Sequence, residues 1–192
     1  GIRRSIATPH IIGDLYRNTP ETINNALEKL REACKKAEIK MEISAAAEYM
    51  LDDYFLDLLR NKSPLLTLQK KFLLTEISYS TPPGNLEMIT ANIIEQGYKP
   101  VLAHPERYFY YHDNFDRYYK LTDMGFLLQV NLLSLTGYYG NGVKKAAKFI
   151  LENNLANLVG TDLHHHQHLS ALSNSKNRAI IQQALGHKVY ND

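Results

Sequence analysis

Residues 99–107 read Lys99-Pro100-Val101-Leu102-Ala103-His104-Pro105-Glu106-Arg107. The first five residues form a short, mainly apolar run with the length and composition of a buried strand. A histidine, a glutamate and an arginine follow where the strand should end. In barrels of parallel strands, functional side chains gather at the carboxyl ends of the strands. This stretch therefore predicts both a parallel strand and a site at its end.

The same arrangement recurs on both sides of this stretch. Runs rich in Ile, Leu, Val and Phe predict strands over residues 3–8, 38–47, 71–77, 99–103, 126–131 and 155–160. Amphipathic segments between them predict helices over residues 19–37, 53–60, 85–96, 114–124, 141–153 and 174–185. A strand followed by a helix, repeated about six times, indicates an α/β protein with a parallel sheet and outer helices, either open or closed into a barrel.

The clearest helix signal covers residues 19–37. Thr19 suits the N-cap and Pro20 the first helical position. The positions that then recur with a helical period are apolar: Ile23, Ala26, Leu27, Leu30 and Cys34. We expect this stripe, including Cys34, to belong to the core.

Composition excludes several classes of protein. The 192 residues are expected to form a single domain, and the net charge of +2 argues against a basic nucleic-acid binder. A hydrophobic content of 44% is too high for a disordered chain. No uncharged apolar run approaches the roughly 20 residues of a membrane span. Cys34 is the only cysteine, which excludes an intrachain disulfide and fits a reducing, cytoplasmic location.

Polar residues follow each predicted strand at intervals of about one strand–helix unit. The residues at these ends are His10, Glu48, Glu76, His104, Asn131 and Asp162, with His164 two residues beyond. If the strands close into a barrel, these ends converge on one face. Histidine and carboxylate ligands suit Zn, Mn or Fe. Arg107 would present its guanidinium to an anion bound by the metals.

Each of these residues also has an ordinary structural interpretation. A single histidine after a strand is more often a cap or an exposed side chain, and Glu48 and Glu76 could be solvated loop carboxylates. Asn131 is interpreted as a structural cap, and the neighbouring His165 and His166 as adventitious metal binders. The recurrence at barrel spacing favours a common site.

Five tyrosines lie just after the Arg107 loop, and they also have two interpretations. They are Tyr108, Tyr110, Tyr111, Tyr118 and Tyr119. Packing of a helix against the barrel is favoured over a lip that stacks on an aromatic substrate.

Five segments together carry a resemblance to a known family. They are T-P-H (8–10), A-E-Y (47–49), L-L-T-E-I-S (73–78), A-H-P-E-R-Y (103–108) and G-T-D-L-H-H (160–165). In this order and spacing, the chain resembles the bacterial metal-dependent protein-tyrosine phosphatases of capsule and exopolysaccharide loci. The resemblance implies a distorted TIM-like (β/α) barrel of the polymerase-and-histidinol-phosphatase (PHP) type. It also implies up to three divalent ions, with manganese expected first and iron or zinc as alternatives.

The resemblance implies six metal ligands: His10, Glu48, Glu76, His104, Asp162 and His164. Glu48 resembles the carboxylate that bridges two metals. Glu76 and His104 resemble ligands of one metal of that pair, and Asp162 resembles a ligand of the other. His10 and His164 resemble ligands of the third.

The resemblance also implies the reaction and the partner. Arg107 matches the arginine that holds the phosphate, and we expect it to act in catalysis with His104 and Asp162. The implied substrate is phosphotyrosine in a protein, specifically the tyrosine-rich tail of a membrane-bound autokinase. The phosphatase itself is expected not to span the membrane and not to bind nucleic acid.

Two departures from the family pattern bear on activity. The family's first motif, an H-x-H at the end of a first strand, has no counterpart here. We therefore expect that the first strand and helix are missing upstream, so that this chain alone binds fewer or no metal ions. We also expect it either to self-associate or to be marginally stable, and its inactivity stays open as an alternative to catalysis. A second phosphate-binding arginine is also not assigned, because Arg178 is too far downstream and Gln167 occupies the expected loop.

Two further functions stay open on the same fold. One is a small-molecule phosphoesterase, such as a histidinol phosphatase. The other is an inactive scaffold that keeps part of the ligand set.

Overall fold

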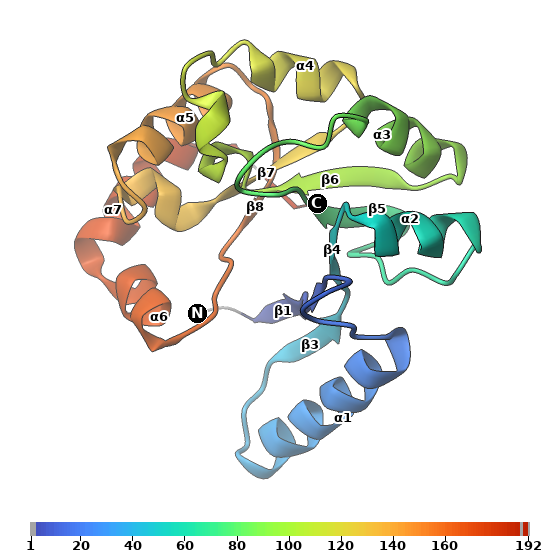
Figure 1. Ribbon diagram of the computed structural model, residues 1–192. Helices are drawn as coiled ribbons and strands as arrows, with labels where there is room; N and C mark the ends of the chain where they lie inside the picture. Colours follow the sequence, from blue (N-terminus) through green and yellow to red (C-terminus); the bar gives the residue numbers. More distant parts are fainter. Residues whose placement is uncertain (1–2, 189, 192) are drawn as a thin grey trace. The chain divides into compact units, whose positions relative to one another are not determined.

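The computed structural model describes residues 3–188 and 190–191, and these form two compact units (Figure 1). Among the described residues, the first unit comprises 3–78 and 83–100, and the second comprises 79–82, 101–188 and 190–191. The expectation of a single domain stays a prediction.

In the first unit, short parallel strands alternate with helices. Its elements are β1 (Arg4–Ala7), β2 (His10–Ile11), α1 (Pro20–Lys36), β3 (Glu42–Ala45), β4 (Glu48–Met50), α2 (Asp53–Arg60), β5 (Phe72–Glu76) and α3 (Leu86–Glu95). Strand β1 pairs with β3, and β4 pairs with β2 on one side and β5 on the other; every pair is parallel.

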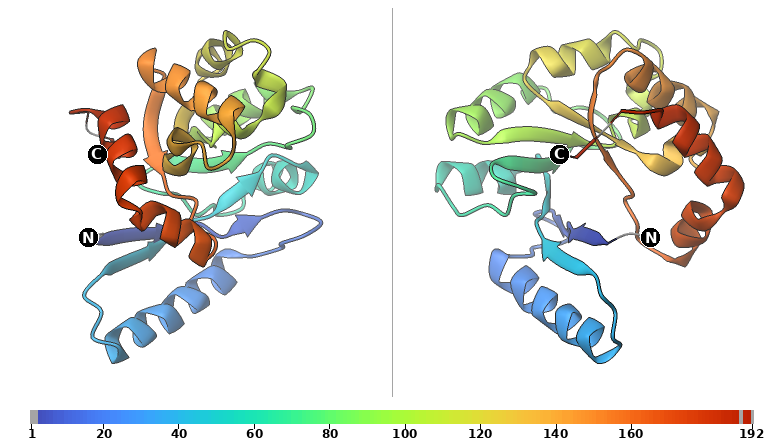
Figure 2. Two further views of the ribbon diagram at one scale, coloured as in Figure 1. Left: turned by 90° about the vertical axis from the view of Figure 1, so that its left-hand side faces the viewer. Right: turned by 180° about the vertical axis from the view of Figure 1, so that it is seen from behind.

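The second unit repeats this alternation and adds several short 3-10 turns. Its elements are β6 (Lys99–Ala103, in this unit from Val101), η1 (Pro105–Arg107), η2 (Phe109–Tyr111), α4 (Arg117–Asp123), β7 (Leu127–Asn131), η3 (Leu132–Thr136), α5 (Asn141–Glu152), β8 (Ala156–Gly160), α6 (His166–Ser173) and α7 (Ser175–Leu185). Strand β7 pairs in parallel with β6 and β8. Helix α5 packs on β7 and η3, and α7 packs on η3 and α5 (Figure 2).

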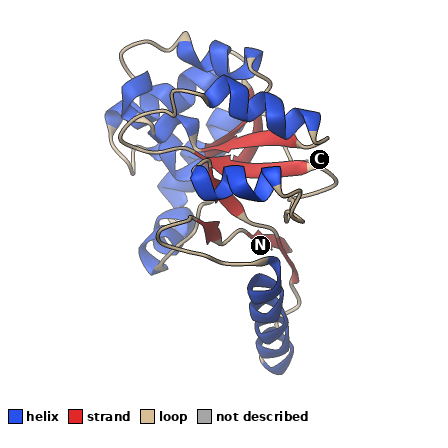
Figure 3. Ribbon diagram, turned by 45° about the vertical axis from the view of Figure 1, so that its right-hand side comes forward, coloured by secondary structure: helices blue, strands red, loops and turns tan. Residues whose placement is uncertain are grey.

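The predicted α/β class with parallel strands is confirmed, and every predicted strand and helix contains an observed one (Figure 3). Strand β6 carries apolar residues at successive positions from Pro100 to Ala103, and Leu128 and Val130 of β7 are apolar too. Val101, Leu102, Leu128 and Val130 are all fully buried. A continuous apolar run such as that of β6 is typical of a parallel strand covered on both faces.

The prediction for the apolar stripe of α1 is partly wrong. Ile23 and Leu27 are buried, but Leu30 is exposed and Cys34 is half-buried beside Arg31 at a shallow surface pocket. Within its unit α1 packs mainly on β3 (Figure 1). A single short strand covers only a narrow part of a helix of 17 residues, so the rest of the stripe stays outside the core.

Among the described residues, no helix combines the length and the hydropathy required to cross a membrane.

Candidate metal and phosphate site

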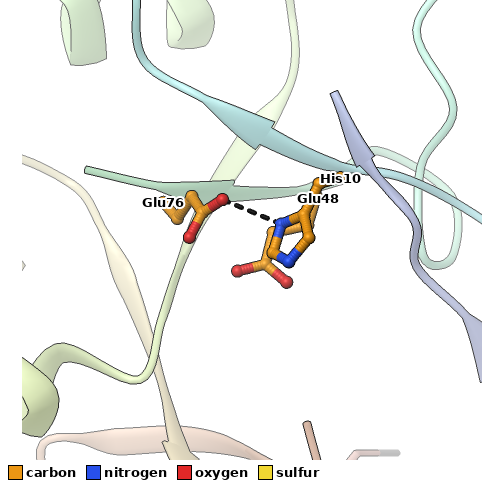
Figure 4. A group of neighbouring side chains, drawn as sticks. All are labelled: His10, Glu48 and Glu76. Carbon is orange, nitrogen blue, oxygen red and sulfur yellow. Dashed lines mark ion pairs between the residues drawn. The ribbon is translucent and has the colours of Figure 1, made fainter. Parts of the chain in front are cut away.

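Three of the predicted ligands lie together in the first unit (Figure 4). His10 begins β2, Glu48 begins β4, and Glu76 ends β5. The parallel register sets His10 opposite Glu48, and Met50 opposite Glu76. The Nδ1 atom of His10 lies 2.9 Å from Oε1 of Glu76. One ligand atom from each of the three side chains lies within 4.8 Å of the others.

This group has the chemistry of a divalent-cation site. Glu48 and Glu76 are only 4% and 3% exposed. Burying two carboxylates side by side costs free energy unless a cation or hydrogen-bond donors compensate. Oxygen donors combined with one imidazole suit Mn, Fe or Zn. The three side chains therefore fit the metal that the sequence predicts.

Hydrogen bonds between loops hold the backbone around His10. The Asn18 side chain donates to the carbonyl of His10 at 2.8 Å. Asp52, the N-cap of α2, also accepts from the backbone N–H of Gly13 at 2.8 Å. A Cβ atom at position 13 would lie 2.7 Å from the Cβ of Tyr54, so the close approach of the two loops requires glycine.

The second unit brings together Arg107, Asp162 and His164. Arg107 Nη1 donates to Asp162 Oδ2, and His164 Nδ1 lies 3.2 Å from Asp162 Oδ1. The side chains of Arg107 and Asp162 are 23% and 13% exposed, so a ligand can reach them while bulk water screens them little. Burial lowers the pKa of Arg107, but the nearby phenols and Asp162 outweigh this, so its pKa is raised and its charge is secure.

His104 and Asp162 share an uncommon backbone conformation. Their φ angles are +39° and +46°, in the left-handed region that few residues other than glycine adopt. His104 directly follows β6, and Asp162 lies two residues beyond β8. Strained backbone at such positions is frequent in functional sites. Beside His104, the Tyr79 hydroxyl lies 3.4 Å from its Nδ1 atom.

Glu106 is a buried carboxyl for which no role was predicted from the sequence. It is 0% exposed, and its Oε1 atom accepts from the Asn131 backbone N–H at 2.9 Å and from the Ser134 hydroxyl at 2.6 Å. These bonds tie η1, which carries Arg107, to the end of β7 and to η3. An acidic residue between Pro105 and Arg107 in a tight turn is the only signal that the sequence offers.

Replacing Glu106 with alanine is expected to lower the free energy of unfolding by about 2–4 kcal/mol, because two buried donors lose their acceptor. Glu106→Gln keeps an acceptor oxygen and should lose clearly less. Denaturant unfolding of the three proteins measures the difference. An alanine variant as stable as the wild type would contradict this role for Glu106.

The comparison with Glu106→Gln also predicts a pH dependence. Burial raises the pKa of Glu106. A carboxyl whose pKa is raised in the folded protein stabilises the fold below its unfolded pKa of about 4.3. That contribution to stability is lost as the pH rises through the pKa of the carboxyl in the folded protein. The stability of the wild type relative to Glu106→Gln should therefore fall as the pH rises from about 4.

The other predicted residues take mainly structural roles. Asn131 caps η3 through its side-chain oxygen, as predicted, and its Nδ2 atom also lies 3.3 Å from Asp162 Oδ2. His165 is the N-cap of α6, a helix that the sequence did not predict. Arg178 lies on α7.

Some of the tyrosines pack in the core, and others contact Arg107. Tyr108, Tyr111 and Tyr118 are buried, which confirms the packing interpretation for these three. The rings that face Arg107 are instead Tyr79 and Tyr139, with centroids 5.4 Å and 4.5 Å from its Cζ atom. The sequence did not single out either residue, because each lies in a loop without a recognisable motif.

Comparison with known proteins identifies one family and several relatives. The model of the family "Capsular polysaccharide synthesis, CpsB/CapC" matches residues 1–192. The tyrosine-protein phosphatase YwqE of Bacillus subtilis is 29% identical over 164 residues, which cover 85% of this chain and 65% of YwqE. The putative tyrosine-protein phosphatase CapC of Staphylococcus aureus is 26% identical over 83% of this chain and 62% of its own length. The tyrosine-protein phosphatase CpsB of Streptococcus pneumoniae is 30% identical over 171 residues, which cover 85% of this chain and 70% of CpsB.

A solved structure of known proteins has a fold similar to that of this chain. It comes from a study of YwqE from Bacillus subtilis and CpsB from Streptococcus pneumoniae, described as unique metal-dependent tyrosine phosphatases. The TM-score is 0.78 at 25% identity, over 99% of this chain and 83% of that chain. The chain spans less than two thirds of the length of YwqE and of CapC.

Proposed function

Because the chain belongs to the CpsB/CapC family of capsular polysaccharide synthesis, we propose that it hydrolyses phosphotyrosine in proteins with bound divalent metal ions. The group formed by His10 and the buried Glu48 and Glu76 carries this proposal, because it combines the ligand types and the close spacing that such ions need.

In this proposal each group of residues has a task of its own. His10, Glu48 and Glu76 hold metal in the first unit, and His104, Asp162 and His164 are proposed as further ligands in the second. When bound, divalent ions neutralise phosphate charge and make hydroxide available near neutral pH.

Arg107 binds and orients the phosphate. Its guanidinium can donate two parallel hydrogen bonds to phosphate oxygens and stabilise the charge that grows on them during the reaction. A tyrosine phenolate, with a parent pKa of about 10, leaves more readily than a serine alkoxide. The reaction needs no cysteine nucleophile, consistent with the place of Cys34 on α1.

Several finer points belong to the same proposal. Manganese is the expected metal, with iron or zinc as alternatives. The expected substrate is the tyrosine-rich tail of a membrane-bound autokinase, and the expected location is the cytoplasm, where a single cysteine stays reduced.

A substrate panel with added manganese tests the proposal against the two other functions. Phosphate release is measured from a phosphotyrosine peptide, the matching phosphoserine peptide and histidinol phosphate. We expect the phosphotyrosine peptide to give the highest kcat/KM. Faster hydrolysis of histidinol phosphate would favour a small-molecule phosphoesterase. Manganese binding without hydrolysis of any of the three would favour a scaffold.

A further inference from the structure

We infer that Tyr139 is a positioning residue that couples the phosphate-binding Arg107 to the loop carrying Asp162 and His164. The inference rests on the proposed function, and it gives the ring and the hydroxyl of Tyr139 separate tasks.

The ring of Tyr139 holds the guanidinium in place. Its centroid lies 4.5 Å from Cζ of Arg107, and the Tyr79 ring makes a second contact at 5.4 Å. A cation over an aromatic face is attracted to it, most strongly where water is partly excluded. Arg107 is 23% exposed, so its rotamers are restricted before a ligand arrives. An arginine that is already ordered loses less conformational entropy when it binds phosphate.

The hydroxyl of Tyr139 reaches the residues beside the predicted ligands. Asn131 Nδ2 lies 3.5 Å from the hydroxyl oxygen and 3.3 Å from Asp162 Oδ2. On the other side, His168 Nε2 lies 3.4 Å from the same oxygen. His168 Nδ1 in turn accepts the backbone N–H of His164 at 3.2 Å. The hydroxyl thus contacts two side chains, each of which contacts a predicted metal ligand.

Burial favours the neutral form of the Tyr139 side chain. His168 is buried and Tyr139 is half-buried. Burial raises the pKa of Tyr139, so its side chain stays a neutral phenol near neutral pH. Tyr139 therefore orients its neighbours by hydrogen bonding and ring contact and is not itself a base. Groups that support metal ligands in this way often affect metal affinity strongly.

Two substitutions separate the two tasks. Tyr139→Phe keeps the ring and removes the hydroxyl, while Tyr139→Leu removes both. Tyr119→Phe and Tyr119→Leu are matched controls, because Tyr119 on α4 also donates a side-chain hydrogen bond, to Asn153 at 2.9 Å. Calorimetry measures the binding of manganese, and then of inorganic phosphate to the manganese-loaded protein. The values of kcat and KM for a phosphotyrosine peptide and the melting temperature are measured in parallel.

We expect Tyr139→Leu to weaken phosphate binding by roughly twofold to thirtyfold and to raise KM by a similar factor. Tyr139→Phe should restore phosphate affinity to within about threefold of the wild type, since it keeps the ring. It should weaken manganese binding by about twofold to tenfold, the worth of a hydrogen bond. Both Tyr119 variants should bind phosphate and manganese like the wild type.

Three results would overturn the inference. They are wild-type phosphate affinity in Tyr139→Leu, equal losses of phosphate affinity in Tyr139→Leu and Tyr139→Phe, and a wild-type protein that binds no phosphate. Binding is measured without turnover, so this test is independent of the substrate. A protein that shows the expected binding pattern but hydrolyses no phosphotyrosine would support the role of Tyr139 while refuting the proposed function.

Discussion

Replacing Arg107 with alanine is expected to lower kcat/KM for a phosphotyrosine peptide by about 10²–10³-fold, the usual cost of losing one group that stabilises charge in the transition state. Arg107 Nη1 already donates to a carboxylate, Asp162 Oδ2, and the guanidinium lies against two tyrosine rings. It is thus a positively charged donor held at a partly exposed position. Steady-state kinetics with manganese, together with the melting temperature, separate lost catalysis from lost folding.

Two further arginine substitutions sharpen this test. Arg107→Lys keeps the charge but cannot form two parallel hydrogen bonds or stack as a plane, so its loss should be smaller than that of alanine. Arg60→Ala removes an exposed arginine paired with Asp57 within α2 and should leave kcat/KM unchanged. Equal activity of Arg107→Ala and Arg60→Ala would show that Arg107 does not bind the phosphate.

Replacing Glu76 with glutamine is expected to weaken manganese binding by at least about 100-fold. Changes beyond the direct ligands already cost about 10–100-fold. The substitution preserves size but removes one of the two buried carboxylates beside His10. Turnover at limiting manganese should fall by a similar factor.

The increase in stability caused by the metal provides a second measurement of the same change. At a manganese concentration 100 times the wild-type Kd, bound metal stabilises the wild type by about 2.7 kcal/mol, and a variant that binds 100-fold more weakly by about 0.4 kcal/mol. Taking the increase for each protein separately cancels differences between the metal-free forms. Glu87→Gln, on the exposed side of α3, is the matched control. If Glu76→Gln keeps the full increase, Glu76 is not a ligand.

Local signals predicted the helices closely. Helix α2 spans Asp53–Arg60 as predicted, and α1 begins after the Thr19 cap with Pro20 in its first turn. Such features depend on residues within one or two turns of each other, so a single sequence contains them. Helix α6 was missed because His168 is its only buried residue and its sequence has no apolar stripe.

Strand ends depend on distant partners and were less predictable. Strand β2 has two residues and β4 has three, and both were missed, because His10 and Glu48 were expected just after the predicted strands 3–8 and 38–47. They are strands because His10 pairs with Glu48, and Glu48 with Leu74. These contacts join residues more than 25 positions apart, which no local pattern encodes.

The same distinction applies to the candidate site. That His10, Glu48 and Glu76 lie close together could be predicted from their recurrence at the spacing of a strand–helix unit. Their exact positions could not, because His10 and Glu48 begin β2 and β4, and only Glu76 ends its strand as predicted. The contacts of Tyr139 and Glu106 could not, because they depend on how separate loops fold around Arg107 and Asn131.

The manganese dependence of phosphate release from a phosphotyrosine peptide tests the central claim most directly. The protein is first freed of metal with a chelator, and activity and calorimetric binding are then followed over one manganese titration. We expect no activity at the start, and a saturating rise whose midpoint matches the Kd for manganese. Hydrolysis that is independent of metal, or manganese binding that brings no hydrolysis, would contradict the proposal that this chain is a metal-dependent protein-tyrosine phosphatase.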